Sequence, residues 1–207
     1  MKSKVTVVGA GNVGATTAQR IFEKGHSDVV LIDVVEGIPQ GKALDILESG
    51  PIVKSDAKII GTNTYEESKD SDIVVITAGI ARKPGMSRDD LLGINLKIMK
   101  QVAEGIKSNC PEAFVICITN PLDVMVMALQ TYSNLPKNKV VGMAGILDSS
   151  RYKLFLSEEL KVPVKQIDAL VMGGHGDTMV PLPGFTKING KKLLDLIEEG
   201  KVSKERI

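Results

Sequence analysis

Short apolar runs without polar alternation recur along the first two thirds of the chain, and stretches with helical periodicity separate them. Strands that are buried on both faces of a parallel sheet show such runs, because neither face contacts water. The alternation of strand and helix therefore predicts an α/β domain with a doubly wound parallel sheet. The expected strands are residues 4–8, 29–32, 58–61, 73–77, 114–119 and 140–143, and the expected helices are 15–24, 39–48, 87–109 and 122–132.

The regular alternation of strand and helix patterns ends after Gly145. A helical pattern at 149–160 then precedes two segments that look like strands, 164–174 and 179–188. We therefore place a domain boundary near residue 144, between a first domain of residues 1–144 and a second of residues 145–207. The chain stops at Ile207, inside a helical pattern that begins near Ser203. This leads to the expectation that the second domain is truncated and present only in its N-terminal part.

The composition is that of a soluble globular protein, with 43% hydrophobic and 25% charged residues. A net charge of +1 gives no reason to expect nucleic acid or a membrane surface as a partner. The chain has no apolar run of membrane-spanning length, and a strand pattern starting at Lys4 leaves no room for a signal peptide. Its two cysteines, Cys110 and Cys117, form neither a metal-ligand pattern nor a disulfide framework. We expect no metal site and a cytoplasmic location.

A glycine fingerprint, Gly9-Ala10-Gly11-Asn12-Val13-Gly14, follows the first strand and opens the first helix. Alone such a motif is weak, but here the strand and helix that it requires are both present. The glycines allow a tight turn, a close approach of a pyrophosphate to the backbone, and helix–strand packing, as in a Rossmann domain. Asp33, 19 residues after Gly14, can bind the adenine-ribose hydroxyls and would repel a 2′-phosphate, which favours NAD over NADP. The alternative for Asp33 is a helix cap or turn residue.

A second candidate site combines Asp148, Arg151 and His175. Asp148 and Arg151 are spaced i, i+3, so they share one face if the segment is helical. His175 lies between glycines after the apolar run 169–172, where a strand would deliver it into a cleft. An imidazole held by a carboxylate beside an arginine suits proton transfer on a substrate that carries a carboxylate. The alternative is a core histidine capped by chance polar neighbours.

Arginine is scarce in this chain, which has five arginines among 26 basic residues. Arg82 and Arg88 both lie in the segment Ile80 to Asp90, which we expect to be a mobile loop because it contains proline, glycine and several charges. The guanidinium group binds carboxylates through two parallel hydrogen bonds, which lysine cannot do. The alternative is an ordinary solvated surface loop.

With both sites in view, the chain resembles the lactate/malate dehydrogenase family over essentially its whole length, and within it the NAD-dependent malate dehydrogenases of the bacterial, lactate-dehydrogenase-like type. The resemblance implies an α+β substrate domain after the Rossmann domain. No single motif is specific, but together they are. The segments that carry the resemblance are residues 9–14, 77–88, 118–121, 145–151 and 173–177.

The resemblance implies a role for each substrate-site residue. His175 would take the proton from the 2-hydroxyl of malate, and Asp148 would hold the imidazole in one tautomer. Arg151 would bind the carboxylate next to the reacting carbon. The Asn120 amide would hydrogen-bond the substrate oxygen, although an Asn-Pro turn is an equally good reading of that residue without the family.

The segment that contains Arg82 and Arg88 would set the substrate preference. In the family such a loop closes over the substrate and excludes water. Arg88 would polarise the carbonyl oxygen, and Arg82 would pair with the second carboxylate of a four-carbon diacid. Lactate dehydrogenases usually carry glutamine at the position of Arg82, so arginine favours malate and oxaloacetate. The residues that the resemblance assigns to NAD are Gly9, Gly11, Asn12, Val13, Gly14, Asp33, Asn95, Thr119 and Asn120.

The resulting hypothesis is an oxidoreductase that transfers a hydride between (S)-malate and NAD, with a small dicarboxylate as its partner and a homodimer or homotetramer as its full-length form. Two alternatives remain. One is a dehydrogenase for lactate or another 2-hydroxy acid, against which Arg82 argues. The other is a non-catalytic NAD-binding fragment of such an enzyme.

Overall fold

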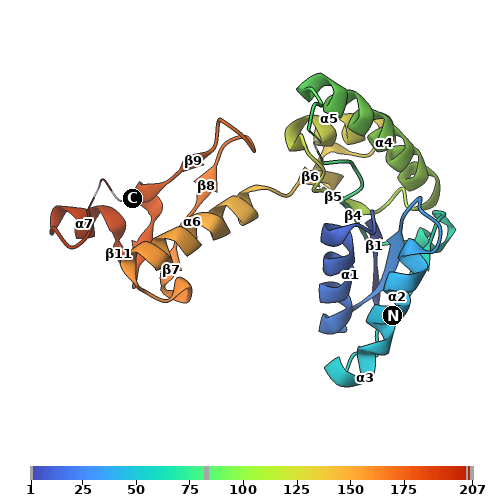
Figure 1. The fold of residues 1–207 in the computed structure, drawn as a ribbon, viewed down its shortest axis with the longest axis horizontal. Helices are drawn as coiled ribbons and strands as arrows, with labels where there is room; N and C mark the ends of the chain where they lie inside the picture. The colour runs from blue at the N-terminus through green and yellow to red at the C-terminus, as the bar shows by residue number, and fades with distance from the viewer. Residues whose placement is uncertain (1, 82–83, 204, 206–207) are drawn as a thin grey trace. The chain divides into compact units, whose positions relative to one another are not determined.

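The computed structural model describes residues 2–81, 84–203 and 205 (Figure 1). The chain forms two compact units, Met1–Gly142 and Met143–Ile207. Within the described residues, no helix is long and apolar enough to cross a membrane.

The first unit contains a six-stranded parallel sheet in the order β3-β2-β1-β4-β5-β6. The expected doubly wound α/β fold is therefore confirmed. The strands are β1 (Ser3–Val8), β2 (Ser27–Ile32), β3 (Ile59–Thr62), β4 (Ile73–Ile76), β5 (Phe114–Cys117) and β6 (Val140–Gly142). The helices are α1 (Asn12–Lys24), α2 (Ile38–Glu48), α3 (Gly50–Val53), α4 (Arg88–Asn109) and α5 (Leu122–Ser133), with 3₁₀ turns η1 (Glu66–Ser68) and η2 (Lys137–Lys139).

The strand order determines which face each helix covers. The connections through α1 and α2 lead toward the β3 edge, and those through α4 and α5 lead toward the β6 edge. Because parallel crossovers are right-handed, the two pairs of helices cover opposite faces of the sheet. The direction reverses between β1 and β4, and the carboxyl ends of strands at such a point are where ligands bind in this class of fold.

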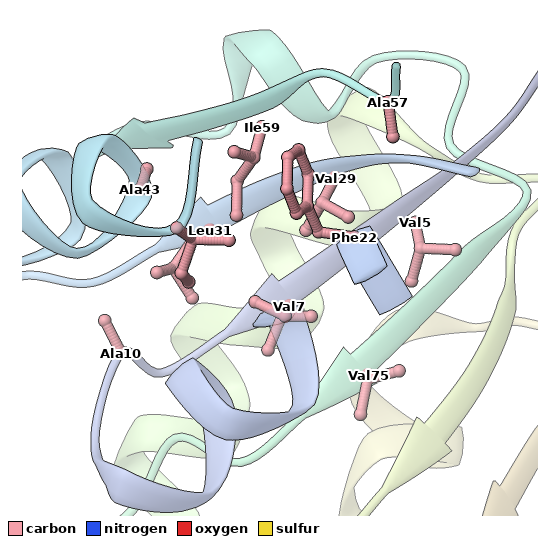
Figure 2. Packing of buried hydrophobic residues seen from close by; sticks show 12 residues of the cluster. Val5, Val7, Ala10, Phe22, Val29, Leu31, Ala43, Ala57, Ile59 and Val75 are labelled. Atoms are coloured by element: carbon pink, nitrogen blue, oxygen red, sulfur yellow. The ribbon is translucent and has the colours of Figure 1, made fainter. Parts of the chain in front are cut away.

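One core cluster of the first unit lies between α1, α2 and the strands β1 to β4, and α4 and α5 bury further apolar side chains. Helix α1 buries Gly14, Ala18 and Phe22, which are spaced four residues apart and so share one face. Figure 2 shows the Phe22 ring beside Val29, and both side chains are fully buried. Truncating a phenylalanine in such a position to alanine typically costs about 3–5 kcal/mol of stability.

The second unit is built on helix α6 (Gly145–Leu160), which begins four residues before the Ser149 start expected from the sequence. Asp148 and Arg151 are consequently both helical. Leu156 of α6 forms a small buried cluster with Ile167, Ile188 and Leu193.

The prediction of two long strands at 164–174 and 179–188 is wrong. Each segment is broken into two-residue strands and turns, because Pro181 and Pro183 lack the N–H that a strand ladder needs and Gly173 adopts a left-handed backbone with φ 93°. The elements are η3 (Val164–Gln166), β7 (Ile167–Asp168), β8 (Val171–Met172), β9 (Val180–Pro181), η4 (Pro183–Phe185), β10 (Lys187–Ile188), β11 (Lys191–Lys192) and α7 (Leu193–Glu198). They form an antiparallel sheet of order β11-β10-β7 and an antiparallel pair β8-β9.

Candidate active site and cofactor-binding site

The glycine fingerprint forms the turn between β1 and α1, as expected. Gly9 has φ 102°, and a Cβ there would lie 2.7 Å from the Thr77 Oγ1 atom. A Cβ on Gly14 would lie 1.7 Å from the Gly9 carbonyl oxygen, so neither position accepts a side chain. A Cβ on Gly11 would instead meet nothing within 4 Å, which leaves the backbone of this residue open to a ligand.

The N-terminus of α1 is suited to an anion. Gly11 is its N-cap and provides no side-chain acceptor, and the first turn carries no acidic residue. Asn12 and Val13, the first two residues of the helix, are exposed. The unpaired N–H groups and the helix dipole favour a phosphate at this end. The residues present therefore fit the pyrophosphate of a dinucleotide.

Asp33 follows β2 and contacts the fingerprint directly. Its Oδ2 atom accepts a hydrogen bond from the Ala10 N–H at 2.6 Å, and its Oδ1 atom accepts one from the Val35 N–H at 3.0 Å. Asp33 is thus a turn residue, as one reading of the sequence had it, and it also ties β2 to the phosphate loop. Each carboxylate oxygen can accept a further hydrogen bond, which leaves capacity for ribose hydroxyls.

Asn95, Thr119 and Asn120 meet at the carboxyl ends of β4 and β5. The fully buried Asn95 amide donates to the Ile80 and Asn120 carbonyls at 3.3 and 2.8 Å, and its oxygen accepts from the Ile80 N–H at 2.9 Å. Thr119 Oγ1 donates to the Ala78 carbonyl at 2.7 Å. Asn95 and Thr119 therefore join the two loops, and the cofactor contacts expected of them stay a prediction. Asn120 is exposed at this edge.

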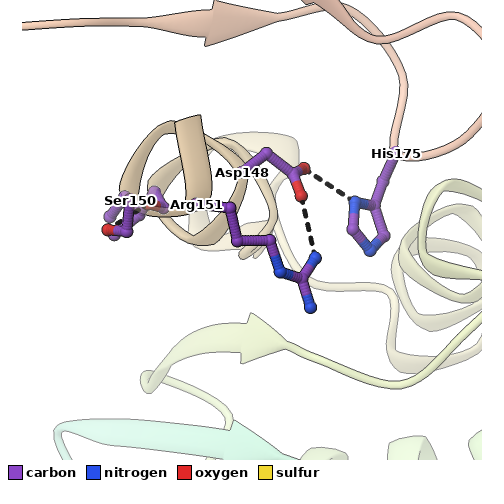
Figure 3. A network of polar contacts seen from close by, with 5 residues as sticks. Asp148, Ser150, Arg151 and His175 are labelled. Atoms are coloured by element: carbon purple, nitrogen blue, oxygen red, sulfur yellow. Dashed lines mark hydrogen bonds and ion pairs between the residues drawn. The ribbon is translucent and has the colours of Figure 1, made fainter. Parts of the chain in front are cut away.

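The second unit brings together all three residues of the second candidate site (Figure 3). Asp148 is 7% exposed, and its Oδ2 atom lies 2.8 Å from the His175 Nδ1 atom. Its Oδ1 atom accepts a hydrogen bond from Arg151 Nη1 at 3.2 Å. Because a carboxylate can only accept, the bond to Asp148 places the imidazole proton on Nδ1. Figure 3 shows the carboxylate between the His175 ring and the Arg151 guanidinium.

His175 and Arg151 remain partly accessible, with side chains 20% and 56% exposed. The single hydrogen bond to Asp148 uses one of the five N–H donors of the guanidinium. His175 lies in the turn that follows β8, not at the end of a long strand. The arrangement can orient an imidazole for proton transfer while an arginine beside it binds an anion.

Two residues that hold these sites were missed by the sequence analysis. Thr77 Oγ1 donates to the carbonyls of Val8 and Gly9 at 3.2 and 3.0 Å, which fixes the start of the fingerprint. Ser149 is buried, and its hydroxyl oxygen accepts a hydrogen bond from the Val171 N–H at 2.9 Å, which ties α6 to β8. Both residues lie in segments that carry the family resemblance, but their partners are backbone groups of distant segments, so the sequence does not reveal this supporting role.

The structure describes the segment Ile80 to Asp90 only in part. Arg82 lies outside the described residues, and so does the side chain of Arg88. The expectation that the whole of 80–90 is a loop is wrong at its end, because α4 begins at Arg88. Ser87 and Asp90 form a capping box, in which Ser87 Oγ accepts from the Asp90 N–H and Asp90 Oδ2 accepts from the Ser87 N–H, both at 3.0 Å. The hydrogen bonds from Ser87 lower the pKa of the Asp90 carboxyl.

Comparison with known proteins decides the family. Residues 3–142 match the NAD-binding domain of lactate/malate dehydrogenases, and residues 146–207 match their alpha/beta C-terminal domain. The chain belongs to the lactate/malate dehydrogenase family. The first unit is accordingly an NAD-binding domain of this family, and the observed fingerprint agrees with that cofactor.

Individual relatives cover the whole chain. A malate dehydrogenase of Pelagibacter ubique is 68% identical over 205 residues, which are 99% of this chain and 64% of that protein. One of Francisella philomiragia is 58% identical over 206 residues, 100% of this chain and 65% of that protein. The crystal structure of Cryptosporidium parvum malate dehydrogenase matches 100% of this chain, and 66% of its own, with a TM-score of 0.96 at 48% identity. The chain thus spans slightly less than two thirds of the length of the curated relatives that it matches.

Proposed function

We propose that the whole protein is an NAD-dependent malate dehydrogenase, which interconverts (S)-malate with NAD and oxaloacetate with NADH. The observation that carries this proposal is the His175–Asp148–Arg151 arrangement, set in a chain whose relatives at 57–68% identity are named malate dehydrogenase. A proton-transferring imidazole and a carboxylate-binding arginine are the two groups that oxidation of a 2-hydroxy acid needs at the reacting carbon.

In the proposed reaction the residues of the second unit handle the proton. His175 accepts the proton of the malate 2-hydroxyl on Nε2, because Nδ1 is bonded to Asp148. Asp148 keeps the ring oriented and stabilises the imidazolium that forms. Arg151 binds the carboxylate next to the reacting carbon. NAD, held by the first unit, supplies the hydride acceptor.

In the first unit we propose that residues at the carboxyl ends of the strands bind NAD and the substrate oxygen. Gly9, Gly11, Asn12, Val13 and Gly14 receive the pyrophosphate, and Asp33 binds the adenine ribose. The Asn120 amide, at the carboxyl end of β5, binds the substrate oxygen. Asn95 and Thr119 hold the edge on which these groups act.

The test is NADH oxidation by the whole protein, followed by absorbance after addition of oxaloacetate or pyruvate. His175→Asn should lose most turnover, by about two or more orders of magnitude, while NADH binding is retained. His26→Asn is the matched control, because His26 is the other histidine of the chain and is exposed. Substantial turnover of oxaloacetate by the His175→Asn variant would exclude His175 as the acid and base.

Substrate preference is a separate part of the proposal. A lactate dehydrogenase of Cryptosporidium parvum, solved with lactic acid and NAD, matches this chain with a TM-score of 0.95 at 47% identity, so the fold does not discriminate between the two substrates. We propose Arg82 as the residue that selects the second carboxylate and Arg88 as the residue that polarises the carbonyl. Arg82→Gln should shift the ratio of kcat/KM for oxaloacetate and pyruvate toward pyruvate by roughly two orders of magnitude. An unchanged ratio would contradict this assignment.

We also propose that the whole protein is a homodimer or homotetramer of the cytoplasm. Four large apolar side chains on α2 and α3 are exposed, which is a surface suited to burial against another subunit. Cys110 and Cys117 are both free thiols, which suits a reducing compartment. Light scattering of the whole protein would test the assembly, and cell fractionation would test the location. The four exposed side chains are Ile38, Leu44, Leu47 and Ile52.

A further inference from the structure

A lysine on α2 contacts the phosphate loop at a position that the fingerprint does not include. The Lys42 ammonium donates a hydrogen bond to the Ala10 carbonyl oxygen at 2.6 Å. The N–H of the same Ala10 donates to Asp33 Oδ2 at 2.6 Å. Ala10 is 1% exposed, so a single buried residue of the loop is held by a cation at its carbonyl and by an anion at its N–H.

The position of Lys42 is fixed by close packing of α2 on β3. A Cβ on Gly61 would lie 2.0 Å from the Pro39 carbonyl oxygen, so the helix approaches the strand as closely as glycine permits. Gln40 then donates to Asn63 Oδ1 at 2.6 Å, and Asn63 donates to the Asp33 carbonyl at 2.7 Å. These contacts hold α2 and the end of β2 as one rigid support.

The contact has an electrostatic consequence for the peptide group between Ala10 and Gly11. The Ala10 carbonyl and the Gly11 N–H belong to that one peptide group, so a cation at the oxygen polarises the N–H and fixes its direction. Gly11 has open space on its Cβ side, and no acceptor for its N–H lies within the described part of the chain. The polarised donor is therefore available to a phosphate.

We propose that Lys42 is a positioning residue for the dinucleotide, which orients and polarises the Ala10–Gly11 peptide group toward the pyrophosphate. The proposal rests on NAD binding by the first unit. It predicts that Lys42 matters for ligands that carry a diphosphate and not for the nucleoside part alone. A lysine that only satisfied a buried carbonyl would stabilise the fold without this distinction.

The experiment compares Lys42→Met with Lys100→Met in the whole protein. Methionine keeps the length of the side chain and removes the charge and the donors. Lys100 is the matched control, since it is an exposed lysine within helix α4. NADH, ADP and adenosine are each titrated into ¹⁵N-labelled protein and followed by the backbone amide signals, and thermal unfolding shows that each variant is folded.

Lys42→Met should weaken NADH and ADP binding by about tenfold or more, as expected for loss of a charged hydrogen bond, and should leave adenosine affinity unchanged within about twofold. The Gly11 amide signal of the ligand-free variant should shift, and Lys42→Arg should recover part of the affinity. Lys100→Met should behave as the wild type.

Two results would overturn the role of Lys42 alone: wild-type affinity of Lys42→Met for NADH, or an equal loss of affinity for adenosine and ADP. Failure of the folded wild type to bind NADH would instead overturn the cofactor site itself, so the two failures are distinguishable.

Discussion

The approach of α2 to β3 through Gly61 makes a sharp prediction about Gly61→Ala. The new Cβ would lie 2.0 Å from the Pro39 oxygen, 2.2 Å from its carbonyl carbon and 2.5 Å from the Gln40 nitrogen. All three are backbone atoms and cannot rotate away. Because Cβ contacts below 3.0 Å are essentially never observed, α2 must withdraw by about 1 Å. Overpacking of this kind costs about 1–3 kcal/mol, and it also pulls Lys42 and Gln40 away from their partners.

The matched substitution is Gly41→Ala, at the fourth residue of α2. A Cβ there would meet nothing within 4 Å, and the position is exposed. Alanine in a helix interior is more favourable than glycine by about 0.5–1 kcal/mol, so Gly41→Ala should stabilise the unit. The two substitutions should thus change the free energy of unfolding in opposite directions, so that the two variants differ by roughly 1.5–4 kcal/mol.

The assay is urea unfolding followed by far-ultraviolet circular dichroism, together with NADH titration of each variant. Gly61→Ala should unfold at lower urea than the wild type and bind NADH more weakly, while Gly41→Ala should unfold at higher urea with unchanged affinity. A Gly61→Ala variant as stable as the wild type would show that the helix is not packed on the strand as described.

Three further substitutions or treatments test other contacts. Asp33→Ser should weaken NADH binding and reduce discrimination against NADPH, and equal wild-type affinity for both in fluorescence titrations would contradict the role of Asp33. Ser149→Ala leaves the Val171 N–H without its acceptor and should lower the free energy of unfolding by about 1–3 kcal/mol, whereas the exposed Ser150→Ala should change it by less than about 0.5 kcal/mol. Burial raises the pKa of the Cys117 thiol from 9.0 to about 11, so iodoacetamide should label it slowly at neutral pH when mass spectrometry compares folded with unfolded chain. Below pH 9.0 the thiol is neutral in both the folded and the unfolded chain, and burying it costs no ionisation free energy. As pH rises from 9.0 toward about 11, the unfolded chain ionises first, so the free energy of unfolding should decline.

The fold of the first unit could be predicted because buried parallel strands are apolar on both faces. Runs such as Val29–Ile32 and Ile73–Ile76 are distinctive for that reason, and each appears as a strand. The second unit could not be predicted in the same way. Its strands are two residues long, which is too short for any periodicity, and their pairing depends on turns.

One signal in the second unit was present but unused. Asn189 and Gly190 both have positive φ, 51° and 79°, and join β10 to β11 as the turn of a hairpin. Asn-Gly between two strand-like segments is a strong hairpin signal, so this turn and the end of the expected strand at Ile188 were accessible from the sequence. Helix α7 follows immediately and was missed with it.

The contacts of the candidate sites also fall into two groups, those that the sequence could predict and those that it could not. The fingerprint and the Asp148–Arg151 pair have fixed local spacings, and the spacing i, i+3 does place both side chains of that pair on one helix face. The bond from Asp148 to His175 spans 27 residues, and the sequence suggested it only through the chemistry of the two groups. Supports such as Lys42 and Ser149 bind backbone atoms far along the chain, and only the folded chain brings those atoms within reach.

Several side chains at the carboxyl edge of the first unit's sheet donate hydrogen bonds to backbone carbonyl groups, and this bears on ligand selectivity. Side-chain donors satisfy carbonyl groups at the carboxyl edge of the sheet, while the N–H groups at the start of α1 are left for a ligand. Bonded carbonyl oxygens beside the free N–H groups of the first turn of α1 leave positive potential at the helix start, so this place favours an anion over a cation. Selectivity for the diphosphate therefore depends on these donors as well as on the glycines, which only make room for it. The donor–acceptor pairs are Thr77 to Val8 and Gly9, Lys42 to Ala10, Thr119 to Ala78, and Asn95 to Ile80 and Asn120.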